Sequence, residues 1–110
     1  MSNCSKDDVI LVRYPFSDLS ASKVRPAVIV SPPYISRDYF IVPLTSNIRN
    51  LLPGEFPLKF WKKAGLNVPT AVKRGIYTIE QSLIVKTLGK LDYSDSQQLQ
   101  NSIKQWFGFL

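Results

Sequence analysis

An arginine and a threonine–serine pair stand at the outer ends of two neighbouring apolar segments. The stretch SKVRPAVIVSPPYISRDYFIVPLTS, residues 22–46, carries Arg25 directly before one proline and Thr45–Ser46 shortly after another. A guanidinium is a planar fork of donors that can bind two phosphate oxygens, and a hydroxyl supplies a further donor. These residue types, so placed, indicate a phosphate-binding site.

The spacing predicts that Arg25 and Thr45 meet. The linker SPPYISRD is too short for a crossover helix, so the two strands should pair antiparallel. A connection centred near residues 34–35 places Arg25 opposite Leu44 or Thr45, and in the second register the two polar side chains share a face. The flanking prolines should end the ladder there, since proline cannot donate to it.

An ordinary structural interpretation competes with the phosphate site. Arg25 would then form an ion pair with Asp18 or Asp38, and Thr45 would only end a strand. The spacing alone leaves this interpretation slightly ahead.

The composition limits the partners and the catalytic groups that this protein can have. The 110 residues suit a single domain, residues 1–110, and the net charge of +6 favours a polyanionic partner such as nucleic acid or an acidic protein. Histidine, the commonest acid–base group and metal ligand, is absent from the sequence. Metal-loop spacing, a glycine-rich phosphate loop and a GxSxG elbow are also lacking. We therefore expect chemistry without a metal or cofactor.

The N-terminal sequence predicts a cytoplasmic protein without a membrane partner. MSNCSKDDVILV has charges directly against its apolar run and no cleavage-site pattern. No apolar run approaches the ~20 residues that span a bilayer. Cys4 is the only cysteine, which excludes an internal disulfide. Its place near the terminus suggests a mobile, incidental residue.

The predicted elements are mainly strands. Apolar runs predict strands over 8–14, 24–31, 38–45 and 85–92, the first of them buried on both faces. Residues 56–66 should form a short strand and a helical turn ending at Gly65. Residues 70–80 should form one bent strand or a tight hairpin at Gly75. The fold class is therefore mainly β (α+β), a small antiparallel β-barrel with short helices.

The C-terminal segment predicts an amphipathic helix. A capping box from Ser94 to Gln97 should open it, and Leu99, Ile103 and Trp106 follow at helical spacing. The helix should pack on the sheet, with Trp106 and its neighbour Phe107 in the core or an interface.

Five segments together resemble the MazF/PemK family of toxins from bacterial toxin–antitoxin modules. They are DVILVRYPF, VRPAVIVS, VPLTS, GLNVPTAVK, and YTIE followed by LGKL, in this order along nearly the whole chain. The RP pair before an apolar strand, followed by PLTS, is the most specific part. The resemblance implies an SH3-like barrel, a homodimer, and metal-free cleavage of single-stranded RNA to 2′,3′-cyclic phosphate and 5′-hydroxyl ends. It also implies catalytic roles for Arg25 and Thr45, and an acidic MazE-like antitoxin as partner.

Two positions depart from that family's pattern. Asp7 stands where a glycine usually precedes the first strand, and Arg74–Gly75 stands where an acidic residue and glutamine are usual. The identity of a general base is therefore open, and Asp18 and Glu80 are the candidates.

Other polar residues near the pair could contact RNA. We expect four basic side chains to meet flanking phosphates and two polar ones to meet base edges. They are Lys23, Arg49, Lys73 and Arg74 for phosphates, and Ser46 and Asn47 for bases. Each of these residue types, taken singly, is more often an ordinary solvated residue.

Two other functions compete. A gyrase poison of the CcdB type shares the fold and acts through its C-terminal tail, for which WFGFL would serve. A small SH3-like RNA-binding module would act without catalysis. The pairing of Arg25 with Thr45 favours RNA cleavage, because neither alternative needs it.

Overall fold

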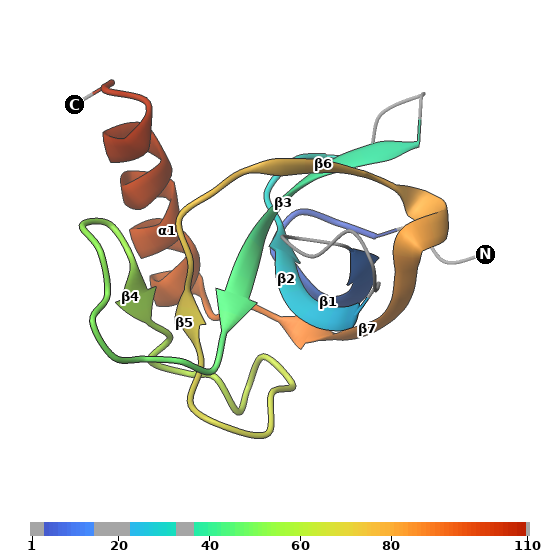
Figure 1. The fold of residues 1–110 in the computed structure, drawn as a ribbon, viewed down its shortest axis with the longest axis horizontal. Helices are drawn as coiled ribbons and strands as arrows, with labels where there is room; N and C mark the ends of the chain where they lie inside the picture. Colours follow the sequence, from blue (N-terminus) through green and yellow to red (C-terminus); the bar gives the residue numbers. More distant parts are fainter. Residues whose placement is uncertain (1–3, 15–22, 33–36, 110) are drawn as a thin grey trace.

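The protein is a mainly antiparallel β-structure with one α-helix at its C-terminal end (Figure 1). A computed structural model describes residues 4–14, 23–32 and 37–109. Its elements, in chain order, are β1 (Asp8–Tyr14), β2 (Lys23–Ile29), β3 (Asp38–Thr45), β4 (Phe56–Pro57), β5 (Ala71–Val72), β6 (Tyr77–Glu80), the 3₁₀ turn η1 (Gln81–Leu83), β7 (Ile84–Lys90) and α1 (Tyr93–Trp106). The predicted fold class is confirmed.

The three N-terminal strands coincide with the predicted apolar segments. β1 and β3 have the predicted bounds, whereas β2 ends at Ile29, two residues before the expected end. The early end has a local cause. The Ser31 hydroxyl accepts the backbone N–H of Phe40 at 3.0 Å, so a side chain takes the place of the next ladder acceptor.

The β2–β3 pairing has the second of the two predicted registers. Ala27 pairs with Pro43, and Ile29 pairs with Ile41. Continued along the same face, this register sets Arg25 opposite Thr45. The paired residues of β2 and β3 end at Ala27 and Pro43, as the positions of the prolines predicted.

β3 is the centre of the sheet. It pairs with β2 at one edge, and with both β5 and β6 at the other. β5 and β6 therefore run in the same direction along β3, separated by residues 73–76, and residues 70–80 form two short strands and no hairpin. Gly75, with φ of 146°, lies between them, in a region of backbone conformation that other residues rarely adopt. Figure 1 shows the chain continuing from β6 through η1 into β7, which pairs with β1 and curves the sheet into a barrel-like shape.

Apolar side chains cover both faces of this sheet. Val9 and Val28 belong to a cluster that includes Leu99 of α1, whereas Ile10 and Ile29 belong to a second cluster on the opposite face. Because successive residues of a strand point to opposite faces, alternate residues of β1 and β2 supply the two clusters. This confirms that the first strand is buried on both faces.

The helix α1 begins earlier than predicted. Its N-cap is Asp92, whose carboxylate accepts the Ser94 N–H at 2.9 Å, so Ser94 lies inside the first turn. The capping box at Ser94 was therefore the wrong boundary. Asp92 is itself among the preferred N-cap residues, and it also accepts from the Lys63 ammonium at 2.6 Å, a partner from a distant turn. The spacing of the apolar face is confirmed, since Leu99 is buried and Trp106 packs against the same cluster.

Cys4 is a core residue, which corrects the expectation of an incidental position near a mobile end. Its side chain is buried among Ile10, Val12 and Tyr39. Burial raises the pKa of the Cys4 thiol, and the nearby Asp8 carboxylate adds to this, against a hydrogen bond with Thr87 that lowers it. Within the described residues, no helix is long and apolar enough to cross a membrane.

Candidate functional site

Arg25 and Thr45 line one cleft of about 380 Å³. Arg25 is exposed on β2 and Thr45 is half-buried at the end of β3. The β2–β3 register accounts for their approach, because it aligns these two strand ends. Arg25 forms no ion pair with any residue in the described part of the chain. Asp38, one of its two expected ion-pair partners, lies at the other end of β3, and the other, Asp18, lies outside the described residues.

The cleft also contains a basic residue that the sequence analysis did not select. Lys86 of β7 pairs with Leu11 of β1, and Leu11 pairs in turn with Pro26 of β2. All three residues line the cleft beside Arg25. The strand pairings thus bring a second cation to the site from a segment far along the chain. No local pattern around Lys86 distinguishes it from the other exposed lysines.

Another side of the cleft comes from the turn that precedes β5. Residues 65–68 and Thr70 line it, and they belong to the GLNVPTAVK segment that supported the family resemblance. The exposed Asn67 and the buried Thr70 were not assigned a role from sequence. Thr70 donates its hydroxyl to the carbonyl of Val68 at 2.8 Å, which holds the turn.

The Thr45 hydroxyl has one lone pair engaged, and no described residue accepts its proton. Its Oγ1 accepts the backbone N–H of Asn47 at 3.1 Å, and the Asn47 side-chain oxygen accepts the N–H of Arg49 at 3.3 Å. A hydroxyl has two acceptor lone pairs and one donor. Thr45 can therefore still donate to a phosphate oxygen, whereas Asn47 helps to hold the turn. Ser46 lines the cleft; Asn47 and Arg49 do not.

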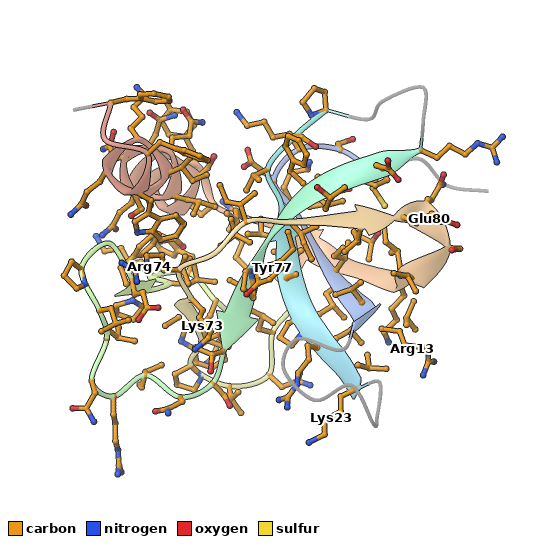
Figure 2. All side chains as sticks on the ribbon, turned by 45° about the horizontal axis from the view of Figure 1, so that its top comes forward. Arg13, Lys23, Lys73, Arg74, Tyr77 and Glu80 are labelled. Carbon is orange, nitrogen blue, oxygen red and sulfur yellow. The ribbon has the colours of Figure 1, made fainter. Side chains whose placement is uncertain are left out.

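The other predicted basic residues lie outside the cleft lining. Lys23, Lys73 and Arg74 are exposed, and Figure 2 shows Lys23 beside Arg13 at one end of β1 and β2, apart from Lys73 and Arg74. Arg13 is a further basic residue there that the sequence analysis did not select. These side chains could meet only the more distant parts of a long substrate.

A glutamate lies beside the backbone of Arg74, the residue that stands where the resembled family usually has an acidic one. Glu55 accepts the N–H groups of Arg74 and Leu52, both at 2.8 Å. Partial burial acts to raise the Glu55 pKa, but these two hydrogen bonds and the charges of Lys73 and Arg74 outweigh it and lower the pKa. A carboxylate with both oxygens engaged and a lowered pKa is a poor proton acceptor.

The two candidate acid–base residues are not brought to the cleft. Asp18 lies outside the described residues. Glu80 pairs with Asp38 at the end of β3 opposite to Thr45, roughly 20 Å away along the strand at ~3.3 Å per residue. Its Oε1 accepts the Ser82 hydroxyl at 2.9 Å. Figure 2 shows Glu80 well separated from Lys73 and Arg74.

The chemical character of the cleft suits an anion. Arg25 and Lys86 contribute charge, Thr45 and Ser46 contribute hydroxyls, Asn67 contributes an amide, and none of the described lining residues is acidic. In the described part of the chain, no group of three or more His, Cys, Asp or Glu could hold a metal ion. A phosphodiester fits these donors.

Comparison with known families identifies the relatives of this fold and cleft. A family model described as "PemK-like, MazF-like toxin of type II toxin-antitoxin system" matches residues 5–107, nearly the whole chain. The chain belongs to this toxin family. The search of curated proteins found no match.

Solved structures of MazF proteins have the same fold. MazF from Deinococcus radiodurans has a TM-score of 0.78 at 17% identity, over 98% of this chain and 99% of that one. The Mycobacterium tuberculosis toxin MazF-mt6 has a TM-score of 0.74 at 23% identity, over 92% and 96%. A mycobacterial endoribonuclease in complex with its cognate antitoxin has a TM-score of 0.76 at 16% identity, over 98% of both chains. The MazF-like architecture is thus confirmed by structure.

The family's usual glycine before the first strand has a conformational explanation in this toxin. Asp7 occupies that position with φ of 75°, the left-handed region that glycine adopts without cost. Aspartate tolerates this region better than most residues. Its carboxylate also accepts the Ser96 hydroxyl at 2.9 Å, which ties the start of β1 to α1.

Proposed function

We propose that this MazF-like toxin is a cytoplasmic endoribonuclease that cleaves single-stranded messenger RNA without a metal ion. The observation that carries the proposal is the presence of Arg25 and Thr45 in one cleft, with Lys86 as a second cation and no acidic residue among its described lining. If the substrate is RNA, the anion that enters the cleft is a phosphodiester.

The proposed reaction uses the substrate's own nucleophile. The ribose 2′-oxygen forms a bond to the adjacent phosphorus, the bond from phosphorus to the 5′-oxygen breaks, and a 2′,3′-cyclic phosphate and a 5′-hydroxyl result. One proton leaves the 2′-hydroxyl for a base, and one reaches the 5′-oxygen from an acid. Asp18 and Glu80 stay the sequence candidates for these two roles, although the position of Glu80 does not support it within one chain.

Arg25 and Thr45 would stabilise the charge that develops on the phosphoryl oxygens. The Arg25 fork can bind two of these oxygens, and the free hydroxyl proton of Thr45 can bind one. Loss of one such donor typically lowers a rate by ~10²–10³. Lys86 would hold the substrate phosphate by charge. Lys23, Arg49, Lys73 and Arg74 would meet flanking phosphates, and Ser46 would meet a base or sugar.

The assembly follows from the same proposal. We expect a homodimer whose RNA groove crosses the interface, and neutralisation by an acidic MazE-like antitoxin. An acidic segment suits a basic groove because complementary charge speeds association and selects the partner. Such a segment would be disordered when free. The family match supports this function over a gyrase poison or a non-catalytic RNA-binding module.

A cleavage assay tests the proposal. A long single-stranded RNA should be cut in the presence of EDTA, and a substrate with one 2′-deoxynucleotide at the scissile position should stay intact there. The control lies in the same RNA: its other cleavage sites keep their 2′-hydroxyl groups and should still be cut. Cleavage at the deoxy position would exclude attack by the 2′-hydroxyl, and loss of all activity in EDTA would exclude metal independence.

A further inference from the structure

The turn formed by residues 65–70 has exposed side chains in the cleft and a firmly held backbone. Asn67 and Val68 are exposed, Val68 to 50%, and both line the cleft that contains Arg25. Behind them, the Leu58 N–H donates to the Thr70 carbonyl at 2.8 Å, and the Leu66 N–H donates to the Trp61 carbonyl at 3.1 Å. Backbone hydrogen bonds thus hold the residues on both sides of Asn67 and Val68.

A buried carboxylate of α1 holds residues 59–60, which precede this turn in the same connection between β4 and β5. Asp95 is only 2% exposed, and its two oxygens accept the backbone N–H groups of Lys59 and Phe60, each at 3.0 Å. A buried charge costs free energy unless it is fully hydrogen-bonded. Asp95 meets that requirement and also lies in the first turn of a helix, where the helix dipole favours a negative charge.

Close backbone packing against β7 holds the middle of the segment. A Cβ atom added to Gly65 would collide with the Leu88 carbonyl oxygen, and one added to Gly89 would lie 2.6 Å from the Ala64 carbonyl oxygen. Residues 59–70 are therefore held at their start by α1, near their middle by β7, and at their end by Leu58, which follows β4. We call residues 65–70 the recognition wall. Figure 1 shows this loop between β4 and β5, beside the end of β3.

We propose that Asn67 contacts the edge of the RNA base next to the phosphate bound at Arg25, and that Asp95 is the positioning residue of the recognition wall. This inference rests on the proposed function for its substrate class. It concerns base recognition, which the proposed cleavage chemistry does not require.

The chemistry of the wall suits a base more than a phosphate. Arg25 and Lys86 already supply the positive charge in the cleft, whereas Asn67 is neutral. An asparagine amide presents a donor and an acceptor in one plane, which matches the paired donors and acceptors on a base edge. Val68 beside it supplies an apolar surface for the face of an unstacked base. Single-stranded RNA exposes both edges and faces of its bases to such contacts.

A binding selection tests the contact without relying on catalysis. The protein is incubated with a randomised pool of short 2′-fluoro RNA, which lacks the nucleophile, and the bound molecules are sequenced. The wild-type protein should select a motif. Asn67→Asp replaces the amide donor with an acceptor and should change the preference at one position of that motif by about tenfold. The other positions should keep their preference, and the melting temperature should stay within error because Asn67 is exposed.

The test of the positioning role needs a control variant that also loses a buried hydrogen bond of α1 but leaves the recognition wall unchanged. Asp95→Asn should broaden the preference at the same motif position and raise KM for the cleaved RNA, with kcat retained. Ser96→Ala is the matched control, because Ser96 is the buried neighbour on α1 and bonds to Asp7, outside the wall. It should lower the melting temperature without changing the motif.

Two results would overturn the inference. One is a wild-type motif retained by Asn67→Asp, and the other is an effect of Asp95→Asn no different from that of Ser96→Ala. A wild-type protein that selects a motif through Asn67 but leaves ordinary RNA uncut would uphold base recognition and refute the proposed nuclease activity.

Discussion

At the scale of single residues, Arg25 and Thr45 differ in how the fold engages them. The Thr45 hydroxyl accepts a hydrogen bond from the turn that follows β3, and its proton stays available. Arg25 is exposed and forms no ion pair with another described residue. Thr45 thus contributes one hydrogen bond to the fold, whereas Arg25 contributes no ion pair with a described residue. This difference allows substitution to separate a role in stability from a role in chemistry.

Substitutions at the two residues should affect cleavage far more than stability. Arg25→Lys should lose activity almost as fully as Arg25→Ala, by ~10²–10³ in rate, because a point charge cannot replace two directed donors. Thr45→Ser should keep much of the activity, whereas Thr45→Val should lose most of it, because only serine retains the hydroxyl. Cleavage rate and melting temperature should be measured on the same four proteins.

The ordinary structural interpretation makes the opposite prediction. Removal of Arg25 would lower the melting temperature, and cleavage would follow only the folded fraction. A folded Arg25→Ala protein with undiminished cleavage would end the catalytic assignment.

Asp7 should show how much the left-handed conformation costs. Asp7→Ala should destabilise the protein by about 1 kcal/mol through the lost hydrogen bond to Ser96, because aspartate and alanine both carry a Cβ atom and share most of the conformational cost at positive φ. Asp7→Gly should lose less, because glycine removes the conformational part. Urea unfolding measures the difference. Equal losses in the two variants would show that the backbone conformation is without cost.

At the scale of elements, α1 is tied to the segment that leads into the cleft. Asp95 accepts two N–H groups of that segment, and Asp92 accepts the Lys63 ammonium from the same segment. The helix is therefore more than a cover for the core cluster around Leu99. A substitution in the first turn of α1 should therefore alter the position of this segment and, with it, the lining of the cleft.

The N-cap of α1 should produce a pH dependence at the acid end. The pKa of Asp92 is lowered from 3.8 to about 2, first by the hydrogen bond from Lys63 and then by those from the Ser94 hydroxyl and N–H. A lowered folded-state pKa means that the stabilisation is complete above the unfolded-state value and is lost as pH falls through the folded-state value. The melting temperature of the wild type should exceed that of Asp92→Asn at pH 5, and the difference should shrink toward pH 2.

A second variant locates the cause. Lys63→Ala removes the largest contribution to the lowered pKa, so the acid-dependent loss of stability should be smaller than in the wild type and should be complete at a higher pH. A difference between wild type and Asp92→Asn that stays constant from pH 5 to pH 2 would contradict the proposed linkage.

At the scale of the whole molecule, the protein combines a positively charged surface with exposed aromatic residues. The net charge is +6, and Phe107 and Phe109 are 57% and 77% exposed after the end of α1. Their rings stack on each other with centroids 5.8 Å apart. Trp106, by contrast, packs against the core cluster that includes Leu99. Of the aromatic residues at this end, Trp106 thus belongs to the core, and the two phenylalanines remain for an interface.

The proposed homodimer should be visible in solution. Light scattering at micromolar concentration should give twice the 12.5 kDa mass of one chain. Phe107→Ser should weaken the dimer if this tail lies in the interface, and Lys62→Ser, a change on a distant exposed turn, should not. A wild-type mass of one chain would refute the assembly, and with it an RNA groove shared by two protomers.

Local pattern determined much of this fold. β-Branched and aromatic runs predicted β1 and β3 to the residue, because a strand buried on both faces needs such residues at nearly every position. The short β2–β3 linker predicted how Arg25 and Thr45 align, because antiparallel pairing across a short connection leaves few registers. The five motifs, in their order along the chain, predicted the family, and the family model confirms that prediction.

Tertiary structure alone decided the remaining features. Lys86 and Asn67 reach the cleft through the packing of β7 and of the turn before β5, whose partners are far away in sequence. Cys4 is buried because side chains of β1 and β3 pack around it, and Asp92, the N-cap of α1, gains an ion pair with Lys63 from a distant turn. Each of these depends on contacts between segments that local propensity does not describe, since the free energy of such contacts exists only once the chain has folded.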